Sequence, residues 1–233
     1  MNQYLYLILD LGSLSIPLLY SVFEKKFHFI QFIKASFFSI LFVAIPFLIW
    51  DVLFTKYGIW GFNSDYHLSI KFFNMPLEEW LFFFCIPYAC LFTHEGIKYY
   101  FPNLKLSKSA TLIIGSLLVL IASFLLVQNF GKWYTTINFS LFLLLILYSL
   151  KYQVESLRVY FPSFLIILIP FTLVNGVLTG SYIENPVVWY NNNENLGYRI
   201  LTIPLEDVFY AFTMLFSVQL IFNRLKKFYK RKQ

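Results

Sequence analysis

Seven apolar segments dominate the chain, and each is long enough to cross a lipid bilayer as a helix. A transmembrane helix needs roughly 17 to 25 mainly apolar residues. The sequence is 59% hydrophobic and 13% charged, whereas an ordinary soluble domain has roughly 25% charged residues. We therefore predict an all-α integral membrane protein with seven transmembrane helices, at residues 4–22, 30–50, 77–97, 110–127, 133–150, 160–178 and 205–222.

The basic residues predict how these helices are oriented. All but four of the 18 Lys and Arg residues fall on one side of the predicted bilayer, and the exceptions are Lys56, Lys71, Lys132 and Arg199. Because the side richer in Lys and Arg faces the cytoplasm, we expect the N-terminus outside and the C-terminus in the cytoplasm, in a bacterial inner membrane. The net charge of +6 then reflects topology and contact with anionic lipid, and no nucleic-acid partner is expected.

A short acidic motif occurs twice, each time at the start of an apolar segment. It reads Pro-Leu-Glu-Glu at residues 76–79 and Pro-Leu-Glu-Asp at residues 204–207. Proline and acids are common in the first turn of any helix, where the acids meet the positive end of the helix dipole. A carboxylate at the edge of hydrocarbon is nevertheless costly, and two copies in a chain with only 12 acidic residues indicate function. The predicted catalytic residues are Glu78, Glu79, Glu206 and Asp207.

Aligning the two motifs reveals an internal repeat with an offset of 128 residues. Each half contains three predicted helices, and the acidic motif opens the third. Three helices alone would leave the second half inverted, so we predict that a linker helix restores its orientation and makes the repeats parallel. The expected division is a first repeat at 1–100, a linker at 105–130, a second repeat at 131–225 and a basic cytoplasmic tail at 226–233. Parallel repeats commonly form a site at their interface.

Helix geometry separates the two acids of each motif. Neighbouring helical residues point roughly 100° apart, so one acid of a pair can face a central pocket while the other braces it by hydrogen bonding. Aromatic rings beside such acids can stabilise a developing cation, and we expect Phe82, Phe83, Tyr210, Trp60 and Tyr57 to contact substrate. The loops after the second helix of each half are also candidates to line the mouth, although Gly and Asn are common in any turn. These candidates are Asp51, Tyr57, Trp60, Asn63, Asn175, Tyr182 and Asn185.

The doubled motif and the three-helix repeat around it resemble the small membrane-integral lycopene cyclases of carotenoid biosynthesis, in the form in which the two halves are fused. The resemblance covers essentially the whole chain. It implies acid-catalysed cyclisation of the ψ-ends of lycopene, with no net redox change and no cofactor or metal. A carboxylic acid protonates the terminal double bond, the neighbouring alkene attacks the cation, and a base removes a ring proton. We expect Glu78 and Glu206 to be the principal pair, with Glu79 and Asp207 orienting them or sharing the proton.

Other functions remain open at this point. Water capturing the same cation would make the protein a carotenoid hydratase, and membrane acids in parallel repeats are also found in transporters. A lipid-binding protein is a further alternative, although it would tolerate Glu78→Gln and Glu206→Gln. The sequence leaves open the β, γ or ε ring type, whether one or both ends react, which carboxyl is the acid, and the oligomeric state.

Overall fold

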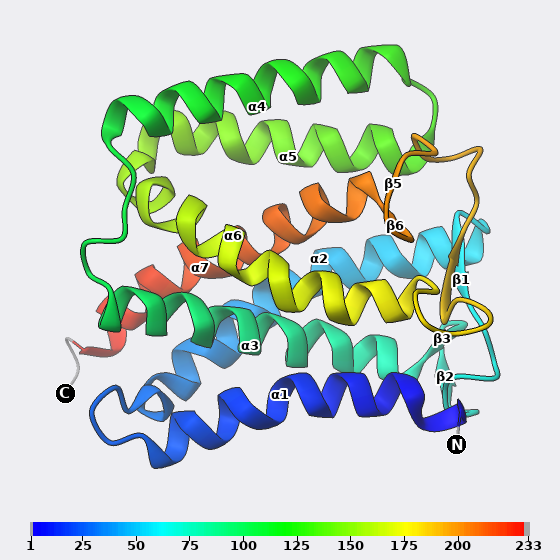
Figure 1. The fold of residues 1–233 in the computed structure, drawn as a ribbon, viewed down its shortest axis with the longest axis horizontal. Coiled ribbons are helices and arrows are strands. Elements are labelled where there is room, and N and C mark those ends of the chain that lie inside the picture. Colours follow the sequence, from blue (N-terminus) through cyan, green and yellow to red (C-terminus); the bar gives the residue numbers. More distant parts are fainter. Residues whose placement is uncertain (1, 231–233) are drawn as a thin grey trace.

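Seven helices run side by side along the long axis of the molecule (Figure 1), in a computed structural model that describes residues 2–230. All seven are long and apolar enough to cross a membrane, so the predicted fold class is confirmed. They are α1 (Leu5–Phe23), α2 (Ile33–Lys56), α3 (Leu77–Tyr100), α4 (Lys108–Gln128), α5 (Trp133–Tyr152), α6 (Val154–Leu178) and α7 (Leu205–Lys230). Arg231 and Lys232 of the expected basic tail lie outside the described residues.

Three helices differ clearly in extent from the sequence prediction. Helix α7 continues past the predicted end at residue 222 to Lys230, so the first part of the expected basic tail is helical. Helix α2 continues to Lys56, so Asp51 lies in its last turns and not in a loop. Helix α6 begins at Val154, before the predicted start at residue 160, and Gln153 alone separates it from α5. Asn175 also belongs to α6. The functional consequence is that Asp51 and Asn175 are held by helix backbone and do not depend on a loop for their position.

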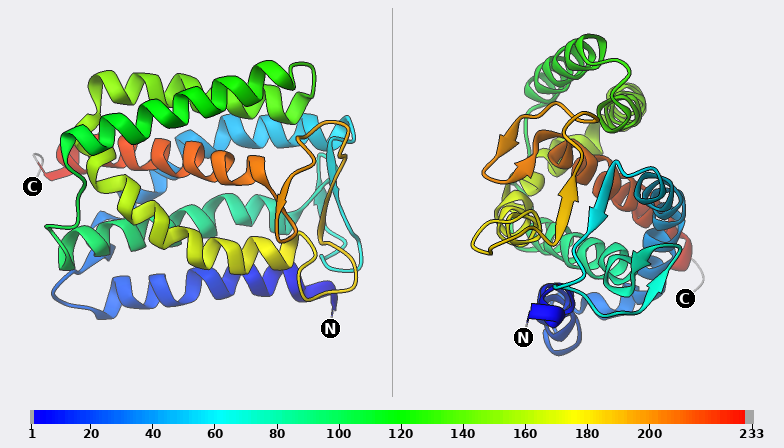
Figure 2. Two further views of the ribbon diagram at one scale, coloured as in Figure 1. Left: turned by 45° about the horizontal axis from the view of Figure 1, so that its top comes forward. Right: turned by 90° about the vertical axis from the view of Figure 1, so that its right-hand side faces the viewer.

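Six short strands gather over one end of the bundle (Figure 2). Strand β2 (Lys71–Phe72) pairs with β3 (Met75–Pro76), and β5 (Arg199–Ile200) pairs with β6 (Ile203–Pro204). Each of these hairpins leads directly into an acidic motif, at the start of α3 and of α7. Strand β1 (Trp60–Phe62) pairs with β4 (Val188–Tyr190) and so joins the loops of the two halves.

The β1–β4 pair marks a pseudo-twofold axis between the halves. Gly61 lies opposite Trp189, and these positions are separated by the repeat offset of 128 residues. The N–H groups of Asn63 and Asn191, separated by the same offset, each donate to a carbonyl in the other half's loop, at 2.8 and 2.9 Å. A Cβ atom at position 61 would clash with the Trp189 ring, which explains the glycine there. The predicted parallel arrangement of the repeats is confirmed, and both acidic motifs lie at this capped end (Figure 1).

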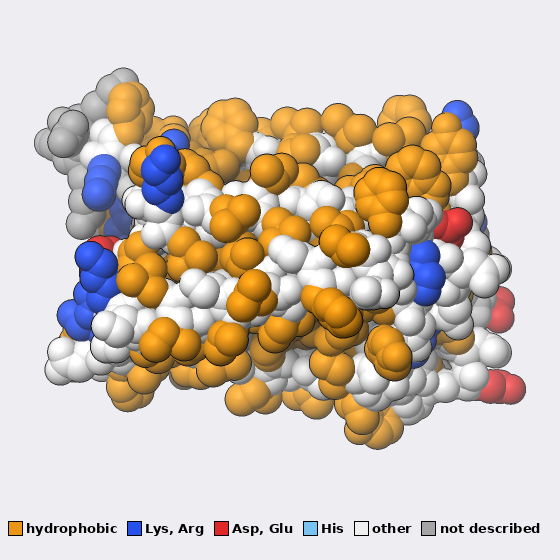
Figure 3. All heavy atoms as spheres, turned by 90° about the horizontal axis from the view of Figure 1, so that it is seen from above, with side chains coloured by type: hydrophobic (Ala, Val, Ile, Leu, Met, Phe, Trp, Pro, Cys, Tyr) orange, Lys and Arg blue, Asp and Glu red, His pale blue; other side chains and the backbone are white. Residues whose placement is uncertain are grey.

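Helices of the first half pack on helices of the second half and so form the interface between the halves. Helix α2 packs on α7, and α3 packs on α6, while α1 and α5 cover the outer sides of α3 and α7. Helix α4 packs on the outside of the second half, against α5 and α6. Hydrophobic side chains cover the flanks of the bundle, and Lys and Arg concentrate toward the end opposite the strands (Figure 3). This distribution suits a bundle whose flanks contact lipid.

Candidate functional site

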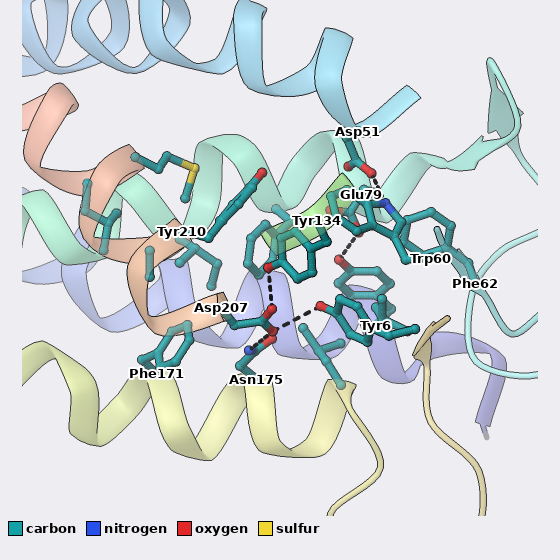
Figure 4. A pocket seen from close by; sticks show the side chains of 18 residues that line it. Tyr6, Asp51, Trp60, Phe62, Glu79, Tyr134, Phe171, Asn175, Asp207 and Tyr210 are labelled. Atoms are coloured by element: carbon teal, nitrogen blue, oxygen red, sulfur yellow. Dashed lines mark hydrogen bonds between the residues drawn. The ribbon is translucent and has the colours of Figure 1, made fainter. Parts of the chain in front are cut away.

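A small cavity of about 70 Å³ lies at the interface between the halves, beneath the β1–β4 pair. Its walls carry three carboxyl groups, one amide and several aromatic rings, and are otherwise apolar (Figure 4). The polar and aromatic wall residues are Asp51, Glu79, Asp207, Asn175, Tyr6, Tyr134, Tyr190, Tyr210, Trp60, Phe62, Phe82 and Phe171. Both repeats contribute, as expected for a site on the pseudo-twofold axis.

The first half supplies a pair of carboxyl groups. Glu79, in the first turn of α3, is 8% exposed, and Asp51 on α2 is 2% exposed. Both carboxyl groups lie in the cavity wall and interact with each other. Tyr6 of α1 donates to Glu79, and the indole N–H of Trp60 donates to Asp51 at 2.5 Å. Two neighbouring buried carboxyls repel each other when both are ionised, so the pair is suited to store and donate a proton.

The second half supplies a single carboxyl group with a full set of donors. Asp207 accepts hydrogen bonds from Tyr134 at 2.5 Å, from Asn175 at 2.8 Å and from Tyr190 at 3.0 Å (Figure 4). Burial, together with the neighbouring Asp207 charge, raises the pKa of Tyr190 well above its ordinary value, so its hydroxyl stays protonated and keeps donating. Three donors can hold the negative charge of a carboxylate, which suits Asp207 to act as a base.

The two halves are therefore equivalent in position but different in chemistry. Tyr6 and Tyr134 are separated by the repeat offset, and each donates to the cavity-facing acid of its own half. The difference comes from the second helix of each half. In the first half, α2 places an acid, Asp51, beside Glu79, whereas in the second half α6 places an amide, Asn175, beside Asp207.

The other acid of each motif braces the capping loops. The backbone N–H of Leu68 donates to Glu78, and that of Leu196 donates to Glu206, both at 2.7 Å. Thr135 adds a further bond, to Glu206 at 2.7 Å. Both glutamates are fully buried and neither lines the cavity. The division of one cavity-facing and one bracing acid is as predicted, but the members are reversed: Glu78 and Glu206 brace, while the neighbouring acids face the cavity.

The reversal has a simple geometric cause. The cavity face of each helix is formed by residues three and seven positions after the facing acid, which are Phe82 and Ile86 on α3 and Tyr210 and Met214 on α7. Helical residues at these spacings share a face. The rotation of each helix about its axis is fixed by packing, and packing points the first acid of each motif at the hairpin loop.

The remaining predicted contact residues divide into two groups. Trp60, Phe82 and Tyr210 line the cavity. Phe83 does not line it and packs in the hydrophobic core between the helices. Tyr57 is 71% exposed and also lies away from the cavity. The expectation that Phe83 and Tyr57 form part of the wall is therefore corrected. The other loop candidates that do not line the cavity are Asn63, Tyr182 and Asn185.

Sequence reasoning missed three hydrogen-bond donors of the site and one buried acid next to it. Tyr6, Tyr134 and Tyr190 donate to the cavity carboxyls. Asp10, one turn after Tyr6 on α1, is fully buried beside Glu78 and has no hydrogen-bond partner among the described residues. The repeat offset was the available signal for the first two. Among residues 2–230 no group of His, Cys, Asp and Glu could hold a metal ion.

The cavity adjoins an apolar groove of about 430 Å³ between α1, α3 and α6. Phe82, Ile86, Phe171 and Asn175 line both, so only these side chains stand between the groove and the cavity. The rest of the groove is lined by aliphatic and small residues of these three helices. A long apolar molecule in the bilayer could therefore reach the carboxyl groups without crossing water.

Comparison with known proteins agrees with this doubled site. The family model described as lycopene cyclase matches residues 3–97 and again residues 131–225. The two matches have the same offset as the acidic motifs, and residues 98–130 between them hold α4. No curated protein and no solved structure matches the chain.

Proposed function

Because the chain belongs to the lycopene cyclase family, we propose that it catalyses cyclisation of the ψ-ends of lycopene, or of a related carotenoid, to β-ionone-type rings. The observation that carries this proposal is the arrangement of two neighbouring carboxyl groups, Asp51 and Glu79, and a third carboxyl group with three hydrogen-bond donors, Asp207, around one cavity. Ring closure needs a proton donor and a proton acceptor at the same end of the substrate, and here the two repeats supply one each.

The proton donor is the Asp51–Glu79 pair. It transfers one proton to the terminal carbon–carbon double bond, and this leaves a tertiary carbocation. The electron pair of the neighbouring double bond then forms the ring carbon–carbon bond and moves the positive charge into the ring. Tyr6 and Trp60 hold the pair's remaining negative charge by hydrogen bonding. Holding the acid and the alkene in one geometry supplies much of the rate enhancement.

The proton acceptor is Asp207. It removes one ring proton, and the electron pair of that carbon–hydrogen bond becomes the ring double bond. One proton enters and one leaves, so the product is an isomer of the substrate and the step is an intramolecular rearrangement without redox change. Proton exchange with water at the membrane face then restores the acid pair and Asp207. The Tyr134, Asn175 and Tyr190 donors keep Asp207 ready to accept.

Aromatic walls stabilise the cation between these two steps. Tyr210 lies between the acid and the base, and its ring centroid is 5.0 Å from those of Phe47 and Trp50. Phe82 and Phe171 line the side that opens to the groove. A cation over such a face gains roughly 0.5–2 kcal/mol per ring. The apolar surroundings also keep water from capturing the cation.

We also propose the arrangement of the chain in the membrane. The strand-capped end with the cavity lies at the outer face, because most Lys and Arg residues lie toward the opposite end (Figure 3). The N-terminus is then outside and the C-terminus cytoplasmic, in a bacterial inner membrane. Residues 1–100 and 131–225 form the two repeats, 105–130 the linker, and 226–233 the basic tail.

Pigment analysis of a lycopene-accumulating bacterial host expressing the chain tests this function. The parent chain should convert lycopene to γ- or β-carotene, and Asp207→Asn should not. A hydroxylated acyclic product would instead identify a carotenoid hydratase. Unchanged lycopene, with the protein shown to be in the membrane, would favour the transporter and lipid-binding alternatives.

A further inference from the structure

The pseudo-twofold axis generates two grooves on the flanks of the bundle. One lies between α1, α3 and α6, and the other, of about 630 Å³, lies between α5, α7 and α2. Positions related by the repeat offset line both: Leu9 corresponds to Ile137, and Ala89 corresponds to Ser217. The two grooves are therefore formed by equivalent backbone segments of the two halves. Any difference in their shape comes from the side chains at equivalent positions.

Of these two grooves, the α1/α3/α6 groove is the one that adjoins the cavity with the carboxyl groups. It shares four wall residues with the cavity, whereas the α5/α7/α2 groove shares none. Trp50 of α2 closes the second route. Its ring centroid lies 5.0 Å from that of Tyr210, 5.5 Å from that of Phe54 and 6.3 Å from that of Tyr134. These rings fill the space through which a substrate would otherwise pass.

The sequence of α6 explains why the first route stays open. The α6 residues Pro170, Phe171, Leu173 and Val174 line the open groove with the same spacing as Pro46, Phe47, Ile49 and Trp50 of α2 in the closed groove. This spacing places Val174 where α2 has Trp50. The open groove thus has a valine where the closed one has a tryptophan.

Small residues widen the open groove along its length as well. Gly12, Ser13 and Ala89 lie on its walls, and a Cβ atom added at Gly12 would meet nothing within 4 Å. The position that matches Ser13 is Leu141, which lines the closed groove. Large side chains at these α1 and α3 positions would project into the groove that leads to the cavity.

We propose that the α1/α3/α6 groove is the binding site for the polyene chain of a linear C40 carotenoid and the single route by which its reacting end reaches the carboxyls. This inference rests on the proposed function. The groove is apolar and lies next to the cavity, so a molecule bound in it has an apolar body facing the bilayer and one end near the acid pair. This arrangement identifies the occupant. The rest of the polyene extends along the groove toward the opposite membrane face.

A single route has a consequence for the order of ring closure. The second end of the carotenoid lies far from the cavity when the first end reacts. Each binding event therefore closes one ring, and the monocyclic product must leave and rebind by its other end. With lycopene in excess, monocyclic carotenoid should accumulate well beyond the amount of enzyme before any bicyclic product forms.

Matched substitutions at repeat-related positions test the groove. In nanodiscs, lycopene binding is followed by quenching of tryptophan fluorescence, in a Glu79→Gln background that prevents turnover. Ala89→Phe should raise the Kd about tenfold or more, which corresponds to a loss of about 1.4 kcal/mol or more, while Ser217→Phe should change it by less than about twofold. Gly12→Leu, on another wall of the open groove, repeats the test should Ala89→Phe fail to fold.

The outcomes separate the groove from the reaction. Equal effects of Ala89→Phe and Ser217→Phe, or a larger effect of Ser217→Phe, would overturn the proposed groove. The expected binding pattern together with a parent chain that makes no cyclic carotenoid would leave the groove standing and overturn the proposed function. Cyclic products from the parent chain, together with equal effects of the two substitutions or a larger effect of Ser217→Phe, would support the proposed function and overturn the proposed groove.

Discussion

Replacing either acid of the first motif should have a very different effect on the rate of ring formation, because the structure places the two acids in different surroundings. Glu79 lines the cavity together with Asp51, whereas Glu78 is buried and accepts from the backbone of Leu68. Glu79→Gln and Glu78→Gln are neighbouring, isosteric changes of one carboxyl group each. They therefore compare a reacting carboxyl with a bracing carboxyl under otherwise matched conditions.

The contacts of each acid give the expected loss of rate and of stability for each variant. The Glu79→Gln side chain keeps an oxygen for the Tyr6 hydroxyl, but an amide cannot protonate an alkene. General acid catalysis typically contributes roughly 10²- to 10⁴-fold in rate, so ring formation by Glu79→Gln should fall by at least about 10²-fold. Glu78→Gln keeps an acceptor for the Leu68 N–H. A bond to a charged group is worth roughly 1 kcal/mol more than a neutral one, so this variant should lose about 1 kcal/mol of stability.

The assay measures initial rates of cyclic carotenoid formation by purified protein in proteoliposomes, with thermal unfolding of each variant as the control for folding. Glu78→Gln should retain a rate within about tenfold of the parent, because Glu78 does not line the cavity and its loss leaves Asp51, Glu79 and Asp207 in place. A folded Glu78→Gln protein that is as inactive as Glu79→Gln would refute the assignment and restore Glu78 as the reacting acid.

Three further predictions concern the base, the opposite end of the bundle and the cap. Asp207→Asn should lower ring formation roughly 10²-fold or more in the same assay, with thermal unfolding as the control that the variant is folded, and a fully active variant would exclude it as the base. Lys226→Met removes a 2.5 Å ion pair with buried Glu95 and should lower the free energy of unfolding by about 1.5–3 kcal/mol in denaturant titrations; an unchanged value would show that the pair does not stabilise the fold. Gly61→Ala forces a methyl group against Trp189 and should cost about 1–3 kcal/mol in the same titration, whereas equal stability would contradict the packed β1–β4 contact.

The sequence determines the architecture well because the bilayer leaves few alternatives. An apolar segment must form a helix in lipid to satisfy its backbone groups, so seven segments predict seven helices. The doubled motif predicts the repeat, and the linker between halves follows from the need to keep both motifs at one face. The strands were not predictable, because runs of two or three residues carry no periodic signal.

The site was predictable only in part. Sequence identifies the acidic motifs, but helix rotation decides whether Glu78 or Glu79 faces the cavity, and rotation depends on packing between distant segments. Asp51 was assigned to a loop because the apolar run ends at Trp50, although the helix continues to Lys56. Tyr6 lies 73 residues from its partner Glu79, and the repeat offset to Tyr134 is what links it to the motif.

In the proposed mechanism, the Asp51–Glu79 pair, whose protons exchange with water, begins ring closure at this cavity. Incubating the parent protein with lycopene in proteoliposomes made up in D₂O, with mass spectrometry of the products, tests this step. We expect cyclic carotenoids that carry one deuterium for each ring, because the proton added to the terminal double bond comes from the exchangeable Asp51–Glu79 pair. Cyclic products without deuterium, or an acyclic alcohol in their place, would contradict this mechanism.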